Sequence, residues 1–232
     1  MVNTIKIGII TINYGRPKIF RLWCASIKRI RRDLGYIPVV VVSGEEDKIV
    51  CNEYNIEHIT QRNHPATQKF NTAMKFMRDL NVKAVIIMGS DDIADSSLIK
   101  KIIDQVEQNI DLIGVKNIYF YSTTGIRKGI LKQLKSTNIL GVCRCLSKSV
   151  LDSVDWTPWS RDSSWGMDGI CMKTILPYIK THATVEGMVV DCKSSESLNK
   201  FSFWDGKLPE EENPSKFYEM LSVEELQILN EI

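Results

Sequence analysis

Two adjacent carboxylates, Asp91 and Asp92, directly follow an apolar run at residues 85–88. This run predicts a strand buried on both faces, which would deliver the following residues to the carboxyl edge of a parallel sheet, where α/β folds place their ligands. Ionised carboxylates are hard oxygen ligands that suit Mg²⁺ or Mn²⁺, and a divalent cation there would relieve their repulsion and hold a phosphate. The alternative is that the pair begins the next helix, because Asp favours the positive end of the helix dipole.

The elements before this pair form strand and helix units. Residues 5–12 and 37–42 predict buried strands, and helical spacing of apolar side chains predicts a helix over residues 17–34 between them. Such a βαβ unit has a right-handed crossover. The pattern continues with further strands and helices, which we expect at residues 47–54 (helix), 56–59 (strand), 67–79 (helix), 85–88 (strand) and 96–109 (helix, with a Ser-Ser start).

The second half has a different rhythm. Two strands, residues 111–122 and 125–131, are expected to pair antiparallel around a Thr-Thr-Gly turn. A strand at 139–146, helices at 147–154 and 169–178, and a strand at 184–191 follow, and Ser222 with Glu225 predicts the cap of a last helix. We expect one α/β domain over residues 1–232, whose second half is smaller and mixed.

The composition is that of an ordinary globular protein. Of 232 residues, 44% are hydrophobic and 25% charged, and the net charge of +2 argues against bulk coating of nucleic acid. The six cysteines are scattered through apolar segments, which indicates reduced, buried thiols and no zinc site. No apolar run reaches the length of a membrane span and no signal peptide is evident, so we expect a soluble, cytoplasmic protein without an integral membrane segment.

Six stretches resemble, in order, those of nucleotide-sugar glycosyltransferases of the GT-A type, close to family 2. They are Ile-Ile-Thr-Ile-Asn-Tyr followed by an Arg (9–16), Ser-Gly-Glu-Glu (43–46), His-Pro-Ala-Thr-Gln-Lys-Phe-Asn (64–71), Met-Gly-Ser-Asp-Asp (88–92), Gly-Val-Cys-Arg (141–144) and Ser-Trp-Gly-Met-Asp (164–168). The likeness spans residues 5–195. It implies that residues 1–110 form a nucleotide-sugar-binding half of the domain and residues 111–232 an acceptor-binding half. It implies an α/β fold of GT-A (Rossmann-like) type, with a mostly parallel central sheet, helices on both faces and a smaller mixed C-terminal part.

The resemblance also implies roles for individual residues. Asp168 is the implied general base of an inverting transfer, and Asp91 with Asp92 would hold Mn²⁺ or Mg²⁺ at the diphosphate of a UDP- or GDP-sugar. Residues implied to bind this nucleotide-sugar donor are Thr11, Asn13, Tyr14, Arg16, Ser43, Glu45, Lys69, Asn71, Ser90, Arg144, Trp165 and Lys193.

The sequence departs from the family pattern in two respects that concern the metal. Gly89 stands where the family commonly has Asp, so the motif is short by one carboxylate, and the histidine that often completes the metal shell is not evident. Lys193, in the segment Val-Val-Asp-Cys-Lys (189–193), is a candidate to meet the diphosphate instead.

Each of these residues also has a structural interpretation. Asp168 could cap the helix at 169–178, and Lys69 and Asn71 could lie in a solvated first turn of their helix. Tyr14 could pack in its loop, and Arg144 could form a surface salt bridge of little worth. The loop tryptophans (Trp156, Trp159 and Trp165) could stack on sugar or base faces, or instead form an apolar plug on the core.

Three functions therefore remain in view. The first is a glycosyltransferase, with a glycan, a protein, a lipid-linked sugar or a hydroxylated base in DNA as acceptor. The second is a nucleotidyltransferase, which would normally have a Gly-rich, basic phosphate loop after the first strand, where this chain has only Gly15 and Arg16. The third is a degenerate GT-A domain that binds nucleotide or glycan without turnover.

Overall fold

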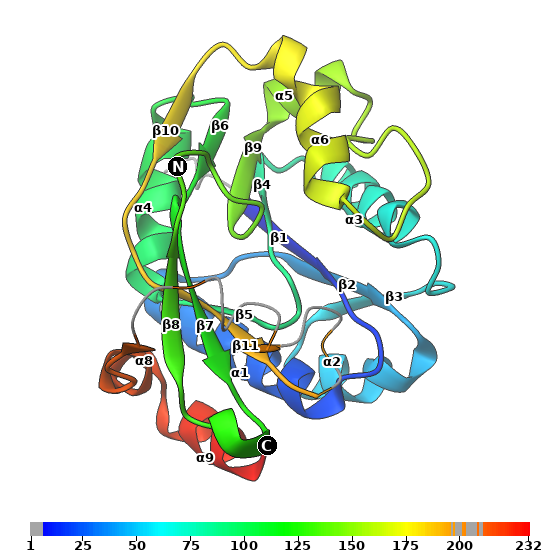
Figure 1. The fold of residues 1–232 in the computed structure, drawn as a ribbon. Coiled ribbons are helices and arrows are strands. Elements are labelled where there is room, and N and C mark those ends of the chain that lie inside the picture. Colours follow the sequence, from blue (N-terminus) through cyan, green and yellow to red (C-terminus); the bar gives the residue numbers. More distant parts are fainter. Residues whose placement is uncertain (1–6, 196, 198–200, 203–207, 209–210) are drawn as a thin grey trace.

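A seven-stranded sheet forms the centre of the computed structural model, which describes residues 7–195, 197, 201–202, 208 and 211–232 (Figure 1). Its order is β10-β6-β9-β4-β1-β2-β3, and β1, β2, β3 and β4 run parallel to one another. Only β9 runs antiparallel to the strands beside it, β4 and β6. The strands are β1 (Ile7–Ile12), β2 (Val39–Ser43), β3 (Glu57–Thr60), β4 (Ala84–Ile87), β6 (Leu112–Gly114), β9 (Arg144–Ser147) and β10 (His182–Thr184).

Helices cover both faces of this sheet (Figure 1). Because successive strand residues point to opposite faces, Ile9 packs into one hydrophobic cluster and Ile10 into the other. The first cluster includes residues of α1 (Pro17–Leu34), α2 (Lys48–Glu53), α4 (Ser96–Glu107), α8 (Ser215–Met220) and α9 (Val223–Glu231). The second includes residues of α3 (Ala66–Asp79), α5 (Lys148–Ser153) and α6 (Met167–Ile175).

A second sheet of five strands lies against the first, in the order β12-β8-β7-β11-β5. Strand β11 lies between β5, with which it pairs antiparallel, and β7, with which it pairs in parallel. The expected antiparallel pairing around the Thr-Thr-Gly turn is confirmed by β7 and β8. The strands are β5 (Asp92–Ala94), β7 (Asn117–Ser122), β8 (Leu131–Lys135), β11 (Val189–Lys193) and β12 (Glu211–Glu212).

Several expected boundaries were wrong. The strand expected at 111–122 is two strands in different sheets, β6 and β7, and the one expected at 184–191 likewise divides into β10 and β11. Residues 125–131 contain a short 3₁₀ helix (Gly125–Arg127), because Gly125 and Gly129 adopt positive φ angles of 69° and 90° that end an extended chain. Of the first expected strand, residues 5 and 6 lie outside the described residues.

The helix ends show which local signals were sufficient. Helix α1 begins at Pro17 as expected, and Ser222 and Glu225 form the expected capping box of α9. Helix α4 begins after Asp95, whose carboxylate accepts a hydrogen bond from the backbone N–H of Ser97, so the Ser-Ser start is not its cap. Asp92 opens strand β5, which excludes the alternative that the carboxylate pair begins a helix.

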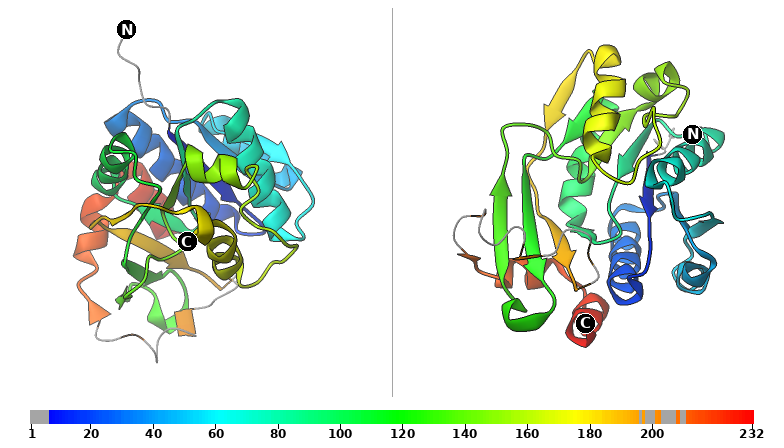
Figure 2. Two further views of the ribbon diagram at one scale, coloured as in Figure 1. Left: turned by 90° about the horizontal axis from the view of Figure 1, so that it is seen from above. Right: turned by 45° about the vertical axis from the view of Figure 1, so that its right-hand side comes forward.

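The C-terminal helix α9 packs beside α1 (Figure 2). Buried Arg29 of α1 donates to both carboxylate oxygens of Glu225, to Ser96 Oγ and to the carbonyl of Ala94. Substitution of either Arg29 or Glu225 would leave the other charge buried and unpaired, which is strongly destabilising. Within the described part of the chain, no helix has the length and apolar character needed to cross a bilayer.

Candidate active site

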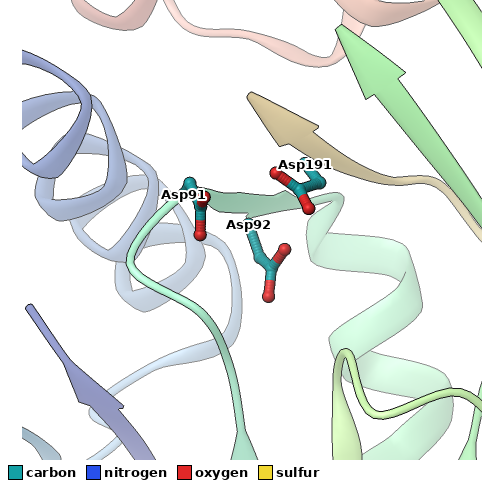
Figure 3. A group of neighbouring side chains, drawn as sticks. All are labelled: Asp91, Asp92 and Asp191. Carbon is teal, nitrogen blue, oxygen red and sulfur yellow. The ribbon is translucent and has the colours of Figure 1, made fainter. Parts of the chain in front are cut away.

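Three aspartates converge where the two sheets meet. Asp91 lies in the turn after β4, Asp92 opens β5, and Asp191 lies on β11 directly opposite Asp92 in the antiparallel register (Figure 3). One carboxylate oxygen from each lies within 4.8 Å of the others. The strand pairing therefore brings together a carboxylate that is distant in sequence and two that are adjacent.

Two cations neutralise part of this charge. Arg16, in the turn after β1, forms an ion pair with Asp91 and donates to Ser90 Oγ at 2.8 Å. The ammonium of Lys193 lies 2.5 Å from Asp191 and 4.0 Å from Asp91. Although burial opposes ionisation of Asp91, Arg16 and Lys193 hold its pKa below the usual value.

The other two carboxyl groups show the opposite shift. Burial, followed by the charges of Asp191 and Asp91, raises the pKa of Asp92 well above its usual value. Burial, followed by the charge of Asp91, raises the pKa of Asp191 to about 7 despite Lys193. The three carboxyl groups are therefore too close together to ionise fully without a further cation.

The donor set fits a hard divalent cation. Asp191 Oδ1 is buried and accepts no hydrogen bond, so the cluster contains one carboxylate oxygen that is free to bind a cation. Mg²⁺ and Mn²⁺ prefer such carboxylate oxygens. Asp91, Asp92 and Asp191 are therefore the residues that would hold the ion.

Asp191 supplies the carboxylate that the sequence motif was missing at Gly89. A Cβ at position 89 would lie 2.8 Å from Asp92 Oδ2 and 2.9 Å from Asp91 Oδ1, so a side chain there would displace both carboxylates. Sequence reasoning missed Asp191, although its spacing of two from Lys193 on a strand places both on one face.

A cavity of about 430 Å³ opens on the Arg16 side of the cluster. Its floor is the turn after β1, its walls come from the residues around the start of α3, and Lys193 reaches it from β11. Among the residues expected to bind the donor, it is lined by Asn13, Tyr14, Arg16, Lys69, Ser90 and Lys193, together with Asp91.

A chain of hydrogen bonds fixes this cavity. Ser90 Oγ, which accepts from Arg16, donates to Asn13 Oδ1, and Asn13 Nδ2 donates to Asp47 Oδ2 at 2.8 Å. The ammonium of Lys69 donates to the carbonyl of Asn13 at 2.7 Å and to Asn63 Oδ1 at 3.2 Å. Lys69 is 1% exposed, which excludes the solvated first turn, and burial lowers its pKa to about 8.

A second cavity of about 350 Å³ adjoins the first. The two share Phe70, Gly89, Asp91 and Met167 in their walls, so Asp91 lies at their junction. The second cavity is also lined by Asp92, Asp191 and Asp168. A group bound in one cavity can therefore meet a group bound in the other beside the carboxylate cluster.

Asp168 lies in the first turn of α6, with its side chain 75% exposed. The cap of α6 is Gly166, at a φ of 61°, so the proposed capping role of Asp168 was wrong. A Cβ at Gly141 would lie 2.0 Å from Asp168 Oδ1, and only glycine leaves this space open. Buried Arg144 lies 3.7 Å from the same oxygen, which rules out a surface salt bridge for Arg144.

Several residues expected at the donor site have other partners. The Asn71 amide donates to the carbonyl of Trp159 at 2.9 Å and accepts from its backbone N–H at 3.3 Å. Ser43 Oγ lies 2.9 Å from His58 Nε2. Exposed Glu45 accepts from Thr60 and from Lys48. None of the three lines either cavity, because each side chain is held by its own strand, loop or helix neighbours.

The remaining expected residues divide in the same way. Thr11 is buried and its hydroxyl donates to the carbonyl of Ile12, at 3.5 Å. Trp165 is 67% exposed and lines neither cavity. Trp156 and Trp159 are buried, as the plug interpretation expected, and Trp159 stacks on Phe70 with 4.7 Å between ring centroids.

Several solved structures share this fold. The fold matches S. aureus TarS 1-349 with a TM-score of 0.56 and 14% identity over 81% of this chain. It matches a cytidylyltransferase from Leptospira borgpetersenii with a TM-score of 0.55 and 13% identity, over 98% of this chain and 94% of that chain. The bifunctional IspDF from Campylobacter jejuni gives 0.52 and 14%, over 88% of this chain and 55% of that chain.

These matches establish the fold, which is similar to those of GT-A glycosyltransferases and nucleotidyltransferases and confirms the expected α/β class. The chain spans 60% of TarS 1-349 and 37% of a longer TarS structure. No protein-family model matches the sequence, and comparison with the sequences of curated proteins gives no match.

Proposed function

We propose that this chain is a glycosyltransferase that moves a sugar from a UDP- or GDP-sugar to an acceptor hydroxyl. The observation that carries the proposal is the junction of two cavities at Asp91, with a cationic donor side and a carboxylate, Asp168, on the acceptor side. This arrangement suits a direct displacement, because the nucleophile attacks the reacting carbon from the side opposite the leaving group.

The first cavity suits a nucleoside diphosphate. Its polar groups gather at one end, where Arg16 and Lys193 flank the carboxylate cluster and can bind phosphate oxygens. A divalent cation held by Asp91, Asp92 and Asp191 would neutralise charge on the departing diphosphate. Asn13, held by Ser90, Asp47 and Lys69, gives the nucleoside end a rigid floor.

The second cavity would hold the acceptor and the proton acceptor. In the proposed step the acceptor oxygen bonds to the anomeric carbon while the bond from that carbon to the diphosphate breaks. Asp168 takes the hydroxyl proton as general base, and direct displacement inverts the anomeric centre. Arg144 lies behind Asp168 and orients its carboxylate.

A nucleotidyltransferase is the alternative that the shared fold favours, since one of the similar structures, the cytidylyltransferase, carries that activity in its name. Such an enzyme must bind the triphosphate of its nucleotide, and Gly-rich basic loops commonly do this. The turn after β1 here is Asn-Tyr-Gly-Arg-Pro, with a single glycine and a single cation. The buried carboxyl cluster argues against a domain that only binds nucleotide or glycan. Groups with strongly shifted pKa values gather at sites that carry out chemistry.

One experiment separates the three functions. UDP-, GDP-, CMP- and dTDP-sugars are incubated with the protein and Mn²⁺ or Mg²⁺, and release of nucleotide is measured; in parallel, nucleoside triphosphates with sugar 1-phosphates are assayed for pyrophosphate. A glycosyltransferase releases nucleotide from one donor class. Release of pyrophosphate instead would identify the nucleotidyltransferase, and binding with neither product would identify the degenerate domain.

Asp168→Asn is the matched test of the base. We expect kcat to fall by about 10²–10⁴ with donor affinity unchanged, since the residue lies on the acceptor side. Asp104→Asn, an exposed change on α4, is the control. Unchanged kcat in Asp168→Asn would contradict the assigned role.

A further inference from the structure

The second cavity is apolar apart from its carboxylates. Among the described residues that line it, every polar side chain is an aspartate, and the others are aliphatic, aromatic or glycine. Phe70, Phe120 and Trp159 supply aromatic rings, and Leu134 and Leu140 supply aliphatic surface. Ligands that bury their faces against such walls are themselves apolar over much of their surface.

The side chains of this cavity also offer no free hydrogen-bond donor within the part of the chain that the structure describes. The indole N–H of Trp159 is already donated to the carbonyl of Met167, at 3.2 Å, and no basic, amide or hydroxyl side chain stands among the described residues of the lining. A sugar presents several hydroxyl oxygens that need donors when they are buried. A molecule with one hydroxyl on an apolar ring places its single O–H against an acceptor and leaves nothing unsatisfied.

The charge of the site argues against an anionic acceptor. Four aspartates (Asp91, Asp92, Asp168 and Asp191) line the second cavity, and among the described residues of this lining there is no lysine or arginine. The nearby cations already face carboxylates, because Arg16 pairs with Asp91, Lys193 with Asp191, and Arg144 lies 3.7 Å from Asp168. An acceptor that carries a carboxylate or phosphate in this cavity would meet like charge.

The volume limits the acceptor to a small group. About 350 Å³ is at the lower end of the roughly 300–1,000 Å³ typical of ligand pockets. One ring system fills it, so any further part of the acceptor lies outside the cavity. Phe70 and Trp159, stacked at 4.7 Å, form a wall against which a flat ring can pack.

We propose that the acceptor is a neutral aromatic or heteroaromatic ring that carries a hydroxyl or hydroxymethyl group, bound in the second cavity. The inference rests on the proposed glycosyl transfer and names its acceptor class. The oxygen of this hydroxyl or hydroxymethyl group forms the new bond to the anomeric carbon, and its proton passes to Asp168. The nucleoside diphosphate leaves with the electron pair of the broken bond. The ring can arrive free or as part of a polymer.

Binding tests the proposal without turnover. Affinities of 5-hydroxymethyluracil, its anionic analogue 5-carboxyuracil and glucose are measured by calorimetry with UDP and Mn²⁺ present. We expect the neutral ring to bind at least about tenfold more tightly than either competitor, because like charge and unmet hydrogen bonds oppose them. Equal or tighter binding of glucose or of 5-carboxyuracil would overturn the proposal.

A charge introduced into the cavity sharpens the test. Leu134→Lys places an ammonium in the lining, and we expect it to raise the affinity for 5-carboxyuracil relative to the neutral ring by about tenfold. Leu176→Lys is the matched control, because Leu176 is 62% exposed and does not line the second cavity. The same preference in both variants would show that the ring binds elsewhere and would overturn the proposal.

Turnover separates this inference from the proposed function. Slow release of nucleotide to water that only sugars accelerate would leave the glycosyltransferase intact and overturn the aromatic acceptor. No release from any donor would remove the proposed function, while the binding preferences would still decide what the cavity takes. Faster nucleotide release with free 5-hydroxymethyluracil, or with an oligonucleotide that contains it, would support the inference. Comparison of the two rates shows whether the ring is taken free or as part of a polymer.

Discussion

The guanidinium of Arg16 forms an ion pair with Asp91 and also donates to Ser90, so the turn after β1 is joined to the turn after β4 at the centre of the site. Arg16 thereby occupies one face of a carboxylate that a metal ion would also use. Cation binding at the cluster and the Arg16 ion pair therefore draw on the same negative charge.

Substitution of Arg16 tests this competition. In Arg16→Gln we expect Mn²⁺ to bind more tightly in the absence of nucleotide, and KM for the donor to rise about tenfold, because a phosphate-binding cation is lost. Titration of Mn²⁺ and donor-dependent kinetics measure the two effects. Arg21→Gln, which breaks an exposed ion pair between Arg21 of α1 and Glu53 of α2, is the control. Weaker metal binding in Arg16→Gln would contradict the competition.

Asp191 is expected to be as necessary for metal binding as the adjacent pair. Asp191→Asn removes the carboxylate with the unsatisfied oxygen, so we expect Mn²⁺ affinity to fall at least about tenfold and kcat/KM about a hundredfold or more. Calorimetric titration with Mn²⁺ gives the first value. Asp104→Asn again serves as control, and retention of full metal affinity in Asp191→Asn would limit the site to Asp91 and Asp92.

Gly141 is expected to set the position of the general base. A Cβ in Gly141→Ala would occupy the place of Asp168 Oδ1, so the carboxylate must rotate away. We expect kcat to fall by about 10²-fold, as for a misplacement of 1 Å, with donor affinity unchanged. Steady-state kinetics and donor titration separate the two.

Gly169→Ala is the matched control for this change. It lies in α6 with open space around its Cβ, and alanine is favoured over glycine in a helix by about 1 kcal/mol. We expect full activity and slightly higher stability. Equal losses in both glycine variants would point to a general effect on α6 instead.

Asn71 is expected to act on the acceptor cavity and not on the donor. Asn71→Ala removes two hydrogen bonds to the backbone of Trp159, which lines the second cavity, and should lower the free energy of unfolding by about 1–3 kcal/mol. We expect KM for the acceptor to rise while donor affinity stays the same. Asn52→Ala, exposed on α2, is the control, and a loss confined to donor affinity would restore the role expected from sequence.

Lys69 gives the stability a defined pH dependence. Burial lowers its pKa to about 8, against an ordinary lysine value of 10.5, so between these values the unfolded chain holds a proton that the folded chain has lost. The unfolded state then binds more protons, and the contribution of Lys69 to the free energy of unfolding rises with pH. It amounts to about 2 kcal/mol between pH 7.5 and 9.5.

The measurement compares urea unfolding of the wild type and Lys69→Met at both pH values, because other groups titrate in the same range. We expect the difference between the two proteins to shift in favour of the wild type as pH rises. Lys75→Met, exposed on the same helix, should show no such shift. A constant difference for Lys69→Met would mean that Lys69 stays protonated.

The local elements could be predicted from the sequence because their signals are local. Apolar spacing with Pro17 predicted α1 with its observed bounds, and the capping box predicted α9. Apolar, mostly β-branched runs predicted β1, β2 and β4 as buried strands, and in the structure β1 pairs in parallel with the other two. The donor-side roles of residues near strand ends, such as Asn13 and Ser90, were implied by the family resemblance.

The pairing of distant strands could not be predicted in the same way. Asp191 joins the cluster only because β11 pairs with β5 in one particular register, and nothing near residue 191 specifies that partner. Likewise, the acidic loop after β2 contributes Asp47 to the hydrogen bond with Asn13, while Glu45 turns outward to Thr60. Choice among neighbouring polar residues depends on loop conformation, which composition does not encode.

The late place of β11 in the chain has a consequence for biosynthesis. A ribosome completes the segments with Asp91 and Asp92 well before it reaches residues 189–193, so the nascent chain holds two repelling carboxylates without Asp191 or Lys193. Because domains generally fold as units during synthesis, the carboxylate cluster is incomplete until β11 has left the exit tunnel and inserted between β5 and β7. A product truncated before that strand would therefore lack the third carboxylate and Lys193, and we expect it to bind divalent cations less tightly.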